Sequence, residues 1–179
     1  MSLRSINAGA GLSPAALHYH FGSKDALVAA LLDRHMPALM ERRRRLFDAL
    51  ERSPGPVGVR EVLEALLRPM VELLEQHREV GHRYLRLLYR LQVDGDLFRL
   101  FPAEKLAGGV DRLVPMLCSA LPDVPLEVVK LRFALAIDVM LRSLALTPPG
   151  SDTDLDAQMQ GLLDFLTGAL EADCSEAAA

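Results

Sequence analysis

Residues 11–27, GLSPAALHYHFGSKDAL, contain the features that decide the interpretation of the whole chain. Ser13 and Pro14 predict the start of a short helix, because serine caps helix N-termini and proline is tolerated in the first turn. Gly22 is placed to end that helix, and Ser23 predicts the cap of a longer helix that runs to about residue 51. The stretch therefore predicts two helices joined by a tight turn.

The short helix has one face that is suited to contact with DNA. Gly11 allows the sharp turn that precedes the second helix of a helix-turn-helix unit. Ala15 and Tyr19 point outward, roughly opposite Leu17, and His18 lies beside them. Small residues let the helix backbone approach the major groove, and polar side chains further along can reach bases or phosphates. The pattern therefore predicts a DNA-reading helix.

Residues 17–24, LHYHFGSK, resemble the TetR family of bacterial transcription regulators. The family pattern is Leu-Tyr-x-His-Phe, then a turn of small residues and a lysine. The sequence departs from this pattern at His18, where the family usually has tyrosine. The resemblance implies a DNA-binding regulator, which we predict to be a repressor. The DNA-contacting residues that it implies, including a phosphate contact at the last of them, are Ser13, Ala15, His18, Tyr19, His20 and Lys24.

The family has a complete first helix before this motif, whereas this sequence has only residues 4–8 there. We therefore expect the DNA-binding head, residues 1–47, to be incomplete and to leave Leu17, Phe21 and Leu27 poorly covered. Each of these side chains contributes roughly 1.5–3 kcal/mol when it is fully buried. The head should consequently be unstable and bind DNA weakly. We expect the full-length form to bind a palindromic duplex operator. An alternative stays open, in which the chain is a helical dimerisation or adaptor protein that does not bind DNA in this truncated form.

The charge distribution favours a protein that meets DNA with one end only. Residues 1–50 have seven Lys and Arg against four Asp and Glu, a net charge of +3, and the rest has 13 against 20, a net charge of −7. Residues 42–45 are four successive arginines. They could form a phosphate-binding patch, but we favour a solvated surface, because four successive side chains point in all directions around a helix.

The remainder of the sequence predicts an all-α body. Patterns that alternate apolar and polar residues are lacking, and clusters of proline, glycine and aspartate separate five helical segments. We expect a partial helix-turn-helix domain with its connecting helix at residues 1–47 and a ligand-binding and dimerisation domain at residues 48–179. The five segments cover residues 59–77, 79–93, 102–121, 126–146 and 155–172.

The last two predicted helices indicate a homodimer. Residues 126–146 are apolar on most faces, and residues 155–172 have an apolar stripe and a second stripe of small residues, so each helix has two faces to bury. In TetR-like proteins the last two long helices of each subunit form a four-helix interface, and two-fold symmetry suits a palindromic operator. The predicted interface residues are Ala134, Asp138, Leu141, Ala157, Gly161, Phe165 and Gly168.

Apolar side chains between the head and this interface predict a ligand pocket. The resemblance implies an apolar or amphipathic small molecule as effector, although any one of these residues could equally be ordinary core. The predicted lining residues are Met70, Leu74, Tyr84, Leu88, Met116, Phe133, Ile137 and Met140.

Other classes of function find little support in the sequence. We predict that the chain is not an enzyme, because no nucleophile, phosphate-loop or zinc-protease motif occurs. His18 and His20 lack the further ligands that a zinc site needs and could also be a solvent-facing pair without a role. No cofactor is expected. The two cysteines read as free thiols, and no signal peptide or membrane span is visible, so we expect a cytoplasmic protein.

Overall fold

The computed structural model describes residues 14–100, 111–147 and 154–174, and within these ranges the chain forms helices and no strand. The predicted all-α fold is thereby confirmed. None of the described helices contains a stretch long and apolar enough to cross a membrane. The helices are α2 (Pro14–Phe21), α3 (Lys24–Arg52), α4 (Val59–Gln76), α5 (Arg78–Val93), α6 (Leu97–Leu100), α8 (Leu113–Ala120), α9 (Leu126–Leu146) and α10 (Leu155–Glu171).

The predicted boundaries of α4, α5, α9 and α10 agree with the structure to within one residue. Proline or glycine clusters mark the start of α4, the end of α5, both ends of α9 and the start of α10. The helix predicted over residues 102–121 lies partly outside the described residues, and α8 is the described part of it. The short helix α6 was not predicted, since four residues are too few to show a helical period.

The turn between α2 and α3 forms as its residue types require. Gly22 has a φ of +70°, in the left-handed region that glycine adopts without strain. The Ser23 hydroxyl then accepts a hydrogen bond from the backbone N–H of Ala26 at 3.1 Å, which caps α3. Asp25 lies in the first turn, where its charge is favoured by the helix dipole. From this start α3 continues for 29 residues, a length of about 44 Å.

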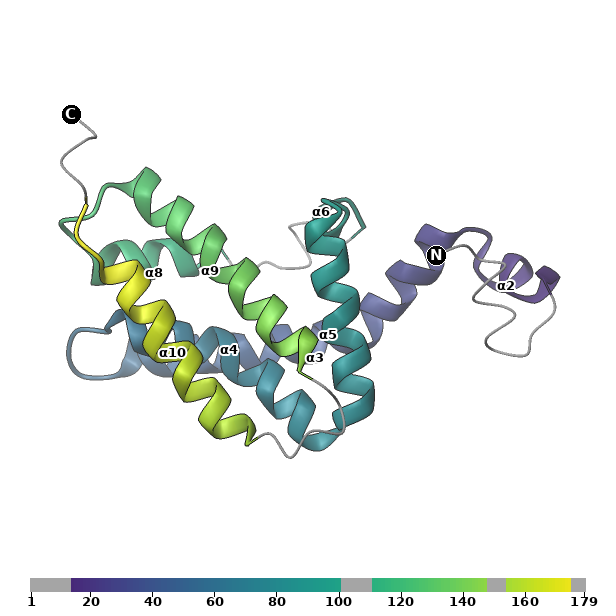
Figure 1. The fold of residues 1–179 in the computed structure, drawn as a ribbon, viewed down its shortest axis with the longest axis horizontal. Helices are drawn as coiled ribbons and strands as arrows, with labels where there is room; N and C mark the ends of the chain where they lie inside the picture. Colours follow the sequence, from purple (N-terminus) through teal and green to yellow (C-terminus); the bar gives the residue numbers. More distant parts are fainter. Residues whose placement is uncertain (1–13, 101–110, 148–153, 175–179) are drawn as a thin grey trace.

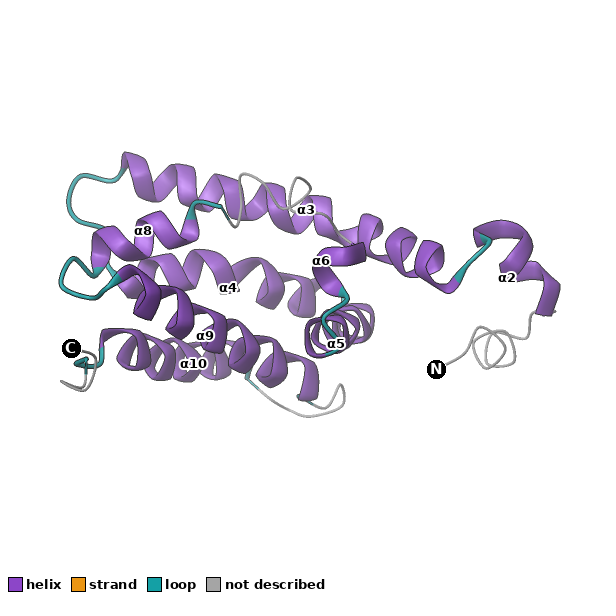
Figure 2. Ribbon diagram, turned by 90° about the horizontal axis from the view of Figure 1, so that it is seen from above, coloured by secondary structure: helices purple, strands orange, loops and turns teal. Residues whose placement is uncertain are grey.

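Helix α4 lies at the centre of the bundle. It packs against α3, α5 and α10, and α9 packs against α5, α8 and α10. Two views at right angles show α3 and α10 on opposite sides of α4 (Figures 1 and 2). They also show that the first part of α3 extends beyond the bundle and carries α2 at its far end. The molecule therefore consists of a bundle and a projecting arm.

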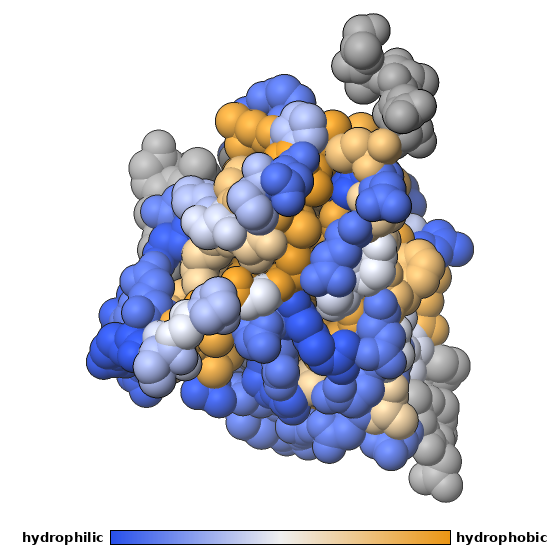
Figure 3. Space-filling view, turned by 90° about the vertical axis from the view of Figure 1, so that its left-hand side faces the viewer, coloured by the Kyte–Doolittle hydropathy of each residue, from blue (hydrophilic) through white to orange (hydrophobic). Residues whose placement is uncertain are grey.

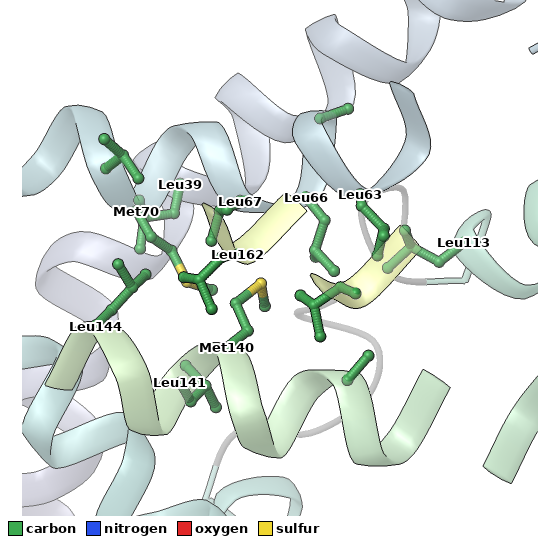
Figure 4. Close-up of a cluster of buried hydrophobic side chains, with 14 of the residues drawn as sticks. Leu39, Leu63, Leu66, Leu67, Met70, Leu113, Met140, Leu141, Leu144 and Leu162 are labelled. Carbon is green, nitrogen blue, oxygen red and sulfur yellow. The ribbon is translucent and has the colours of Figure 1, made fainter. Parts of the chain in front are cut away.

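The core of the bundle forms where leucines of α4 meet those of α9, with further side chains from α3, α8 and α10 (Figure 4). Met140 of α9 reaches into the centre of this cluster and is 1% exposed. Burial of each such side chain stabilises the fold by roughly 1.5–3 kcal/mol. The residues labelled in Figure 4 are Leu39, Leu63, Leu66, Leu67, Met70, Leu113, Met140, Leu141, Leu144 and Leu162.

The four successive arginines of α3 have different environments. Arg42 pairs with Glu72 of α4 at 2.7 Å, whereas Arg44 and Arg45 both pair with Glu41 of their own helix. These three side chains are exposed, as expected for a solvated surface. Arg43 is the exception, because its side chain points into the bundle and is 2% exposed.

Candidate functional site

A cavity of about 240 Å³ lies inside the bundle, with walls from α3, α4, α5, α6, α8 and α9. Nearly all of its lining is apolar. A ligand site of this kind is typically a largely apolar cavity with a few polar groups that orient the bound molecule. The lining residues are Met36, Leu39, Met40, Arg43, Leu66, Met70, Leu88, Gln92, Leu97, Leu113, Phe133, Ala134, Ile137, Met140 and Leu141.

The structure brings five of the eight predicted pocket residues together in this cavity: Met70, Leu88, Phe133, Ile137 and Met140.

The other three predicted pocket residues do not line the cavity. Leu74 and Tyr84 are buried elsewhere in the core, and Met116 is half-buried against it. The Tyr84 hydroxyl donates a hydrogen bond to the Leu32 carbonyl at 3.4 Å, and its ring meets the His35 ring edge-on. These three side chains are ordinary core residues, because their helix positions direct them to neighbouring helices and away from the cavity.

Helix α3 supplies a wall that sequence reasoning missed. Met36, Leu39, Met40 and Arg43 follow one another at intervals of three, one and three residues, so they share one face of the helix. That periodicity was present in the sequence. It was overlooked because we interpreted α3 only as a connection between head and body.

The cavity has two polar side chains, Arg43 and Gln92, in its lining. Gln92 is half-buried, and its side-chain N–H donates to a carboxylate oxygen of Asp138 at 3.3 Å. Asp138 is exposed on α9, so Gln92 lies between the cavity and the surface of that helix.

The guanidinium of Arg43 has few partners among the described residues. Its Nη2 donates to the Leu66 carbonyl at 3.0 Å, and Nη1 lies 3.7 Å from the Met40 sulfur. Its buried Nε–H has no hydrogen-bond partner there. Burial lowers the pKa of the Arg43 guanidinium to about 10, which still leaves it charged at neutral pH. The site therefore contains a buried positive charge within an apolar surface.

The predicted reading helix, α2, lies at the end of the arm, beyond the bundle (Figure 1). None of its residues is in the lining of the cavity. On α2 the side chains of His18, Tyr19 and His20 are all exposed, and Tyr19 is 86% exposed. The Tyr19 and His20 rings meet edge-on at 5.4 Å between centroids. Lys24 is exposed at the first residue of α3. Three polar side chains and a lysine are thus free to contact a partner.

Two predicted DNA-contacting residues are only partly placed. Ser13 lies outside the described residues. The backbone of Ala15 belongs to α2, but its side chain is not described.

Besides α3 itself, an ion pair on α6 connects the cavity region to the start of α3. Arg99 of α6 pairs with Asp25 at 2.7 Å and with Asp96 at 3.0 Å. Leu97, on the same short helix, lines the cavity. The hydrogen bond from Arg99 lowers the pKa of the Asp25 carboxyl below its ordinary value. Helix α6 therefore contacts both the cavity and the base of the head.

Helices α9 and α10 expose apolar side chains together. A space-filling view of the end where α9 begins and α10 ends shows an apolar band between hydrophilic surfaces (Figure 3). On a monomer such a surface commonly marks a site of association. The large exposed apolar residues of these two helices are Leu126, Leu131, Leu135, Val139, Leu146 and Phe165.

Six of the seven predicted interface residues are exposed on these helices: Ala134, Asp138, Ala157, Gly161, Phe165 and Gly168.

Leu141 differs from this prediction. It is 3% exposed and lines the cavity, because it lies one residue from Met140 on the inward face of α9. Within the protomer its side chain is already covered. We therefore remove Leu141 from the expected interface and place it in the wall of the cavity.

Two family models match the chain. Residues 64–169 match the model described as Tetracyclin repressor-like, C-terminal domain, and residues 1–31 match that of bacterial regulatory proteins, tetR family. No curated protein matches the chain. The first match covers more than half of the residues and includes α5, α8 and α9, which line the cavity. The chain belongs to the TetR family of bacterial DNA-binding transcription regulators.

Proposed function

We propose that this chain is a repressor that binds a palindromic DNA operator as a homodimer and responds to a small apolar or amphipathic molecule in the cavity. One observation carries the proposal. A single helix, α3, begins beside the exposed reading helix and lines the cavity further along, at Met36, Leu39 and Met40. Movement of that wall is therefore transmitted to the head along one helix, in which Pro37, between Met36 and Leu39, has no backbone N–H to donate to the preceding turn.

The ion pair between Arg99 and Asp25 supports this coupling. Leu97 contacts the cavity two residues before Arg99, so a ligand that displaces α6 also shifts a charge held at the first turn of α3. A ligand changes DNA affinity only by its differential affinity for the two arrangements. A ligand in the cavity can therefore change the orientation of the head in two ways, through α3 and through the ion pair between Arg99 and Asp25.

Dimerisation through α9 and α10 is supported by their exposed apolar side chains. Leu131 and Leu135 are 62% and 57% exposed and lie one turn apart on α9, and Phe165 of α10 is 62% exposed. Members of the family typically act as homodimers that bind operator DNA. We propose residues 1–47 as the DNA-binding domain and residues 48–179 as the ligand-binding and dimerisation domain.

Selection of binding sequences from random duplex DNA tests the proposal directly. Low salt strengthens phosphate contacts and compensates for the weak binding that the sequence predicts. We expect enrichment of an inverted repeat whose half-sites lie about one helical turn, roughly 34–36 Å, apart or a multiple of it. Failure to enrich any sequence at low salt would overturn it and favour the adaptor alternative.

A further inference from the structure

Arg43 has a different environment from its sequence neighbours Arg42, Arg44 and Arg45, which are exposed. Its side chain is 2% exposed and belongs to the largest fully buried side chains of the described residues, yet it lines the cavity. Arginine is almost never fully buried unless it is paired. Among the described residues no carboxylate forms an ion pair with Arg43, whereas Arg42 and Arg45 each pair with one and Arg44 pairs with two.

The hydrogen bonds of Arg43 leave most of its capacity unused. A guanidinium has five N–H donors in a planar fork, and one Arg43 donor reaches a carbonyl, that of Leu66. The sulfur of Met40 is a weak acceptor, and the Nε–H has no partner within the described part of the chain. A single neutral carbonyl cannot balance a full positive charge.

A structural role for Arg43 is the simplest alternative. Pro69 lies inside α4 and cannot donate the backbone hydrogen bond that a residue at this position normally supplies to the preceding turn. The carbonyl that loses this donor is that of Ala65, four residues before Pro69, whereas Arg43 donates to the carbonyl of the next residue, Leu66. A structural role would then be to hold α3 against α4 through this bond. An uncharged donor would serve this purpose without the cost of burying a charge, so the carbonyl alone does not account for an arginine.

We propose that Arg43 binds the carboxylate of an amphipathic ligand whose apolar body fills the cavity. This inference rests on the proposed ligand-responsive function and specifies its ligand as an apolar carboxylic acid in ionised form. The planar guanidinium fork matches a carboxylate in two parallel hydrogen bonds. The apolar lining contributed by side chains such as Phe133, Ile137 and Met140 suits the remainder of the molecule.

Within the described ranges no carboxylate pairs with Arg43, and this explains why such a ligand would be held firmly. An ion pair in a low-dielectric site is stronger than one in water, and here the desolvation of the arginine is already part of the folded protein. A carboxylate that binds Arg43 therefore pairs with a guanidinium that has already lost its hydration shell, and no further desolvation of the arginine opposes binding. An alcohol of the same chain length gains the apolar contacts alone, and an alkylammonium ion meets a like charge.

Thermal unfolding of the unmodified chain gives the first test. Matched probes are decanoate, decan-1-ol and decylammonium, used below their micelle concentrations, with the series from hexanoate to dodecanoate to match chain length to the cavity. Ligand binding raises the melting temperature by linkage. We expect the carboxylate to raise it more than the alcohol, and the ammonium ion to have no stabilising effect.

The variant R43M gives the second test, and R42M is its matched control. Both remove one arginine charge from neighbouring positions, but Arg42 does not line the cavity. We expect R43M to bind decanoate about 10- to 100-fold more weakly, because it loses a charged hydrogen bond to the ligand. R42M should bind decanoate with unchanged affinity. Ligand-free R43M should melt at the same temperature as the unmodified chain or higher, because an apolar isostere replaces an unpaired buried charge.

The possible outcomes separate the two proposals. Equal or greater stabilisation by decan-1-ol in the unmodified chain overturns the carboxylate assignment and leaves a ligand-responsive regulator intact. Stabilisation by none of the acids or by the alcohol counts against both. If R43M does not fold, the structural role of Arg43 is supported, and the comparison of acid with alcohol in the unmodified chain still decides the ligand class.

Discussion

At the scale of single residues, two side chains of the same type can have different roles because their environments differ. Arg42 and Arg43 are adjacent and chemically identical, yet one pairs with Glu72 at the surface and the other lies in an apolar wall. Tyr19 and Tyr84 differ in the same way, since one is 86% exposed on α2 and the other is 5% exposed in the core. Exposure therefore identifies Tyr19 as a side chain available to DNA.

Replacement of Tyr19 by alanine tests the reading helix. A base or phosphate contact of this kind is worth about 1–3 kcal/mol, so operator affinity should fall by about 5- to 150-fold. The melting temperature of the free protein should not change, because the side chain covers none of the core. Fluorescence anisotropy with a selected operator and thermal unfolding provide the two readouts. Unchanged affinity would exclude Tyr19 from the contact surface.

At the residue level, the sequence predicted that α9 is rich in apolar side chains, and two of those predicted for the pocket, Phe133 and Met140, lie in the cavity wall. Leu141 shows the limit, because a helix that is apolar all round does not reveal which side faces a cavity and which a partner. Arg43 could not be placed from the sequence, since a run of arginines gives no sign that one of them is buried.

At the scale of elements, α3 and α4 organise the molecule. The cap at Ser23 and the glycine turn before it were predictable, because both depend on local backbone chemistry. The role of α3 as a cavity wall was not, because it depends on which helices pack together. A close approach between α4 and α5 illustrates this point: a Cβ added to Gly81 would lie 2.9 Å from the Leu73 carbonyl oxygen.

Replacement of Gly81 by alanine tests this close approach. Helix propensity alone predicts a gain in stability of up to about 1 kcal/mol. Contact with a backbone oxygen that cannot rotate away predicts the opposite, a loss of about 1–3 kcal/mol. We expect the loss to dominate in urea unfolding. A net gain would show that α4 and α5 can separate without cost, and would contradict the packing described here.

At the scale of the whole molecule, the projecting arm and the exposed apolar face of α9 and α10 support the proposed homodimer. The reading helix α2 lies at the end of the arm, beyond the bundle (Figures 1 and 2). Within the described part of the chain Leu131 and Leu135 remain exposed to solvent. The sequence predicted a DNA-binding end and a separate association surface. The first prediction came from the excess of basic residues near the start, and the second from the apolar periodicity of the last two helices. Which individual residues remain exposed depended on packing.

Replacement of Leu135 by glutamate should convert a dimer to a monomer, because a charge in an apolar interface loses its hydration. Sedimentation of the unmodified chain should give twice the chain mass of 19.7 kDa, and the variant should give that mass itself. L31E is the matched control, since Leu31 is also exposed, at 42%, but lies on α3. A monomeric unmodified chain at micromolar concentration would refute the proposed interface.

In the proposed function, occupancy of the cavity controls DNA binding, and one titration tests this control most directly. The affinity of the protein for its selected palindrome is measured by fluorescence anisotropy with and without a saturating concentration of decanoate or decan-1-ol, whichever raises the melting temperature more. Couplings of this kind typically change affinity by about 5- to 150-fold. We expect a change of at least fivefold. The same operator affinity at zero and at saturating ligand would contradict the account.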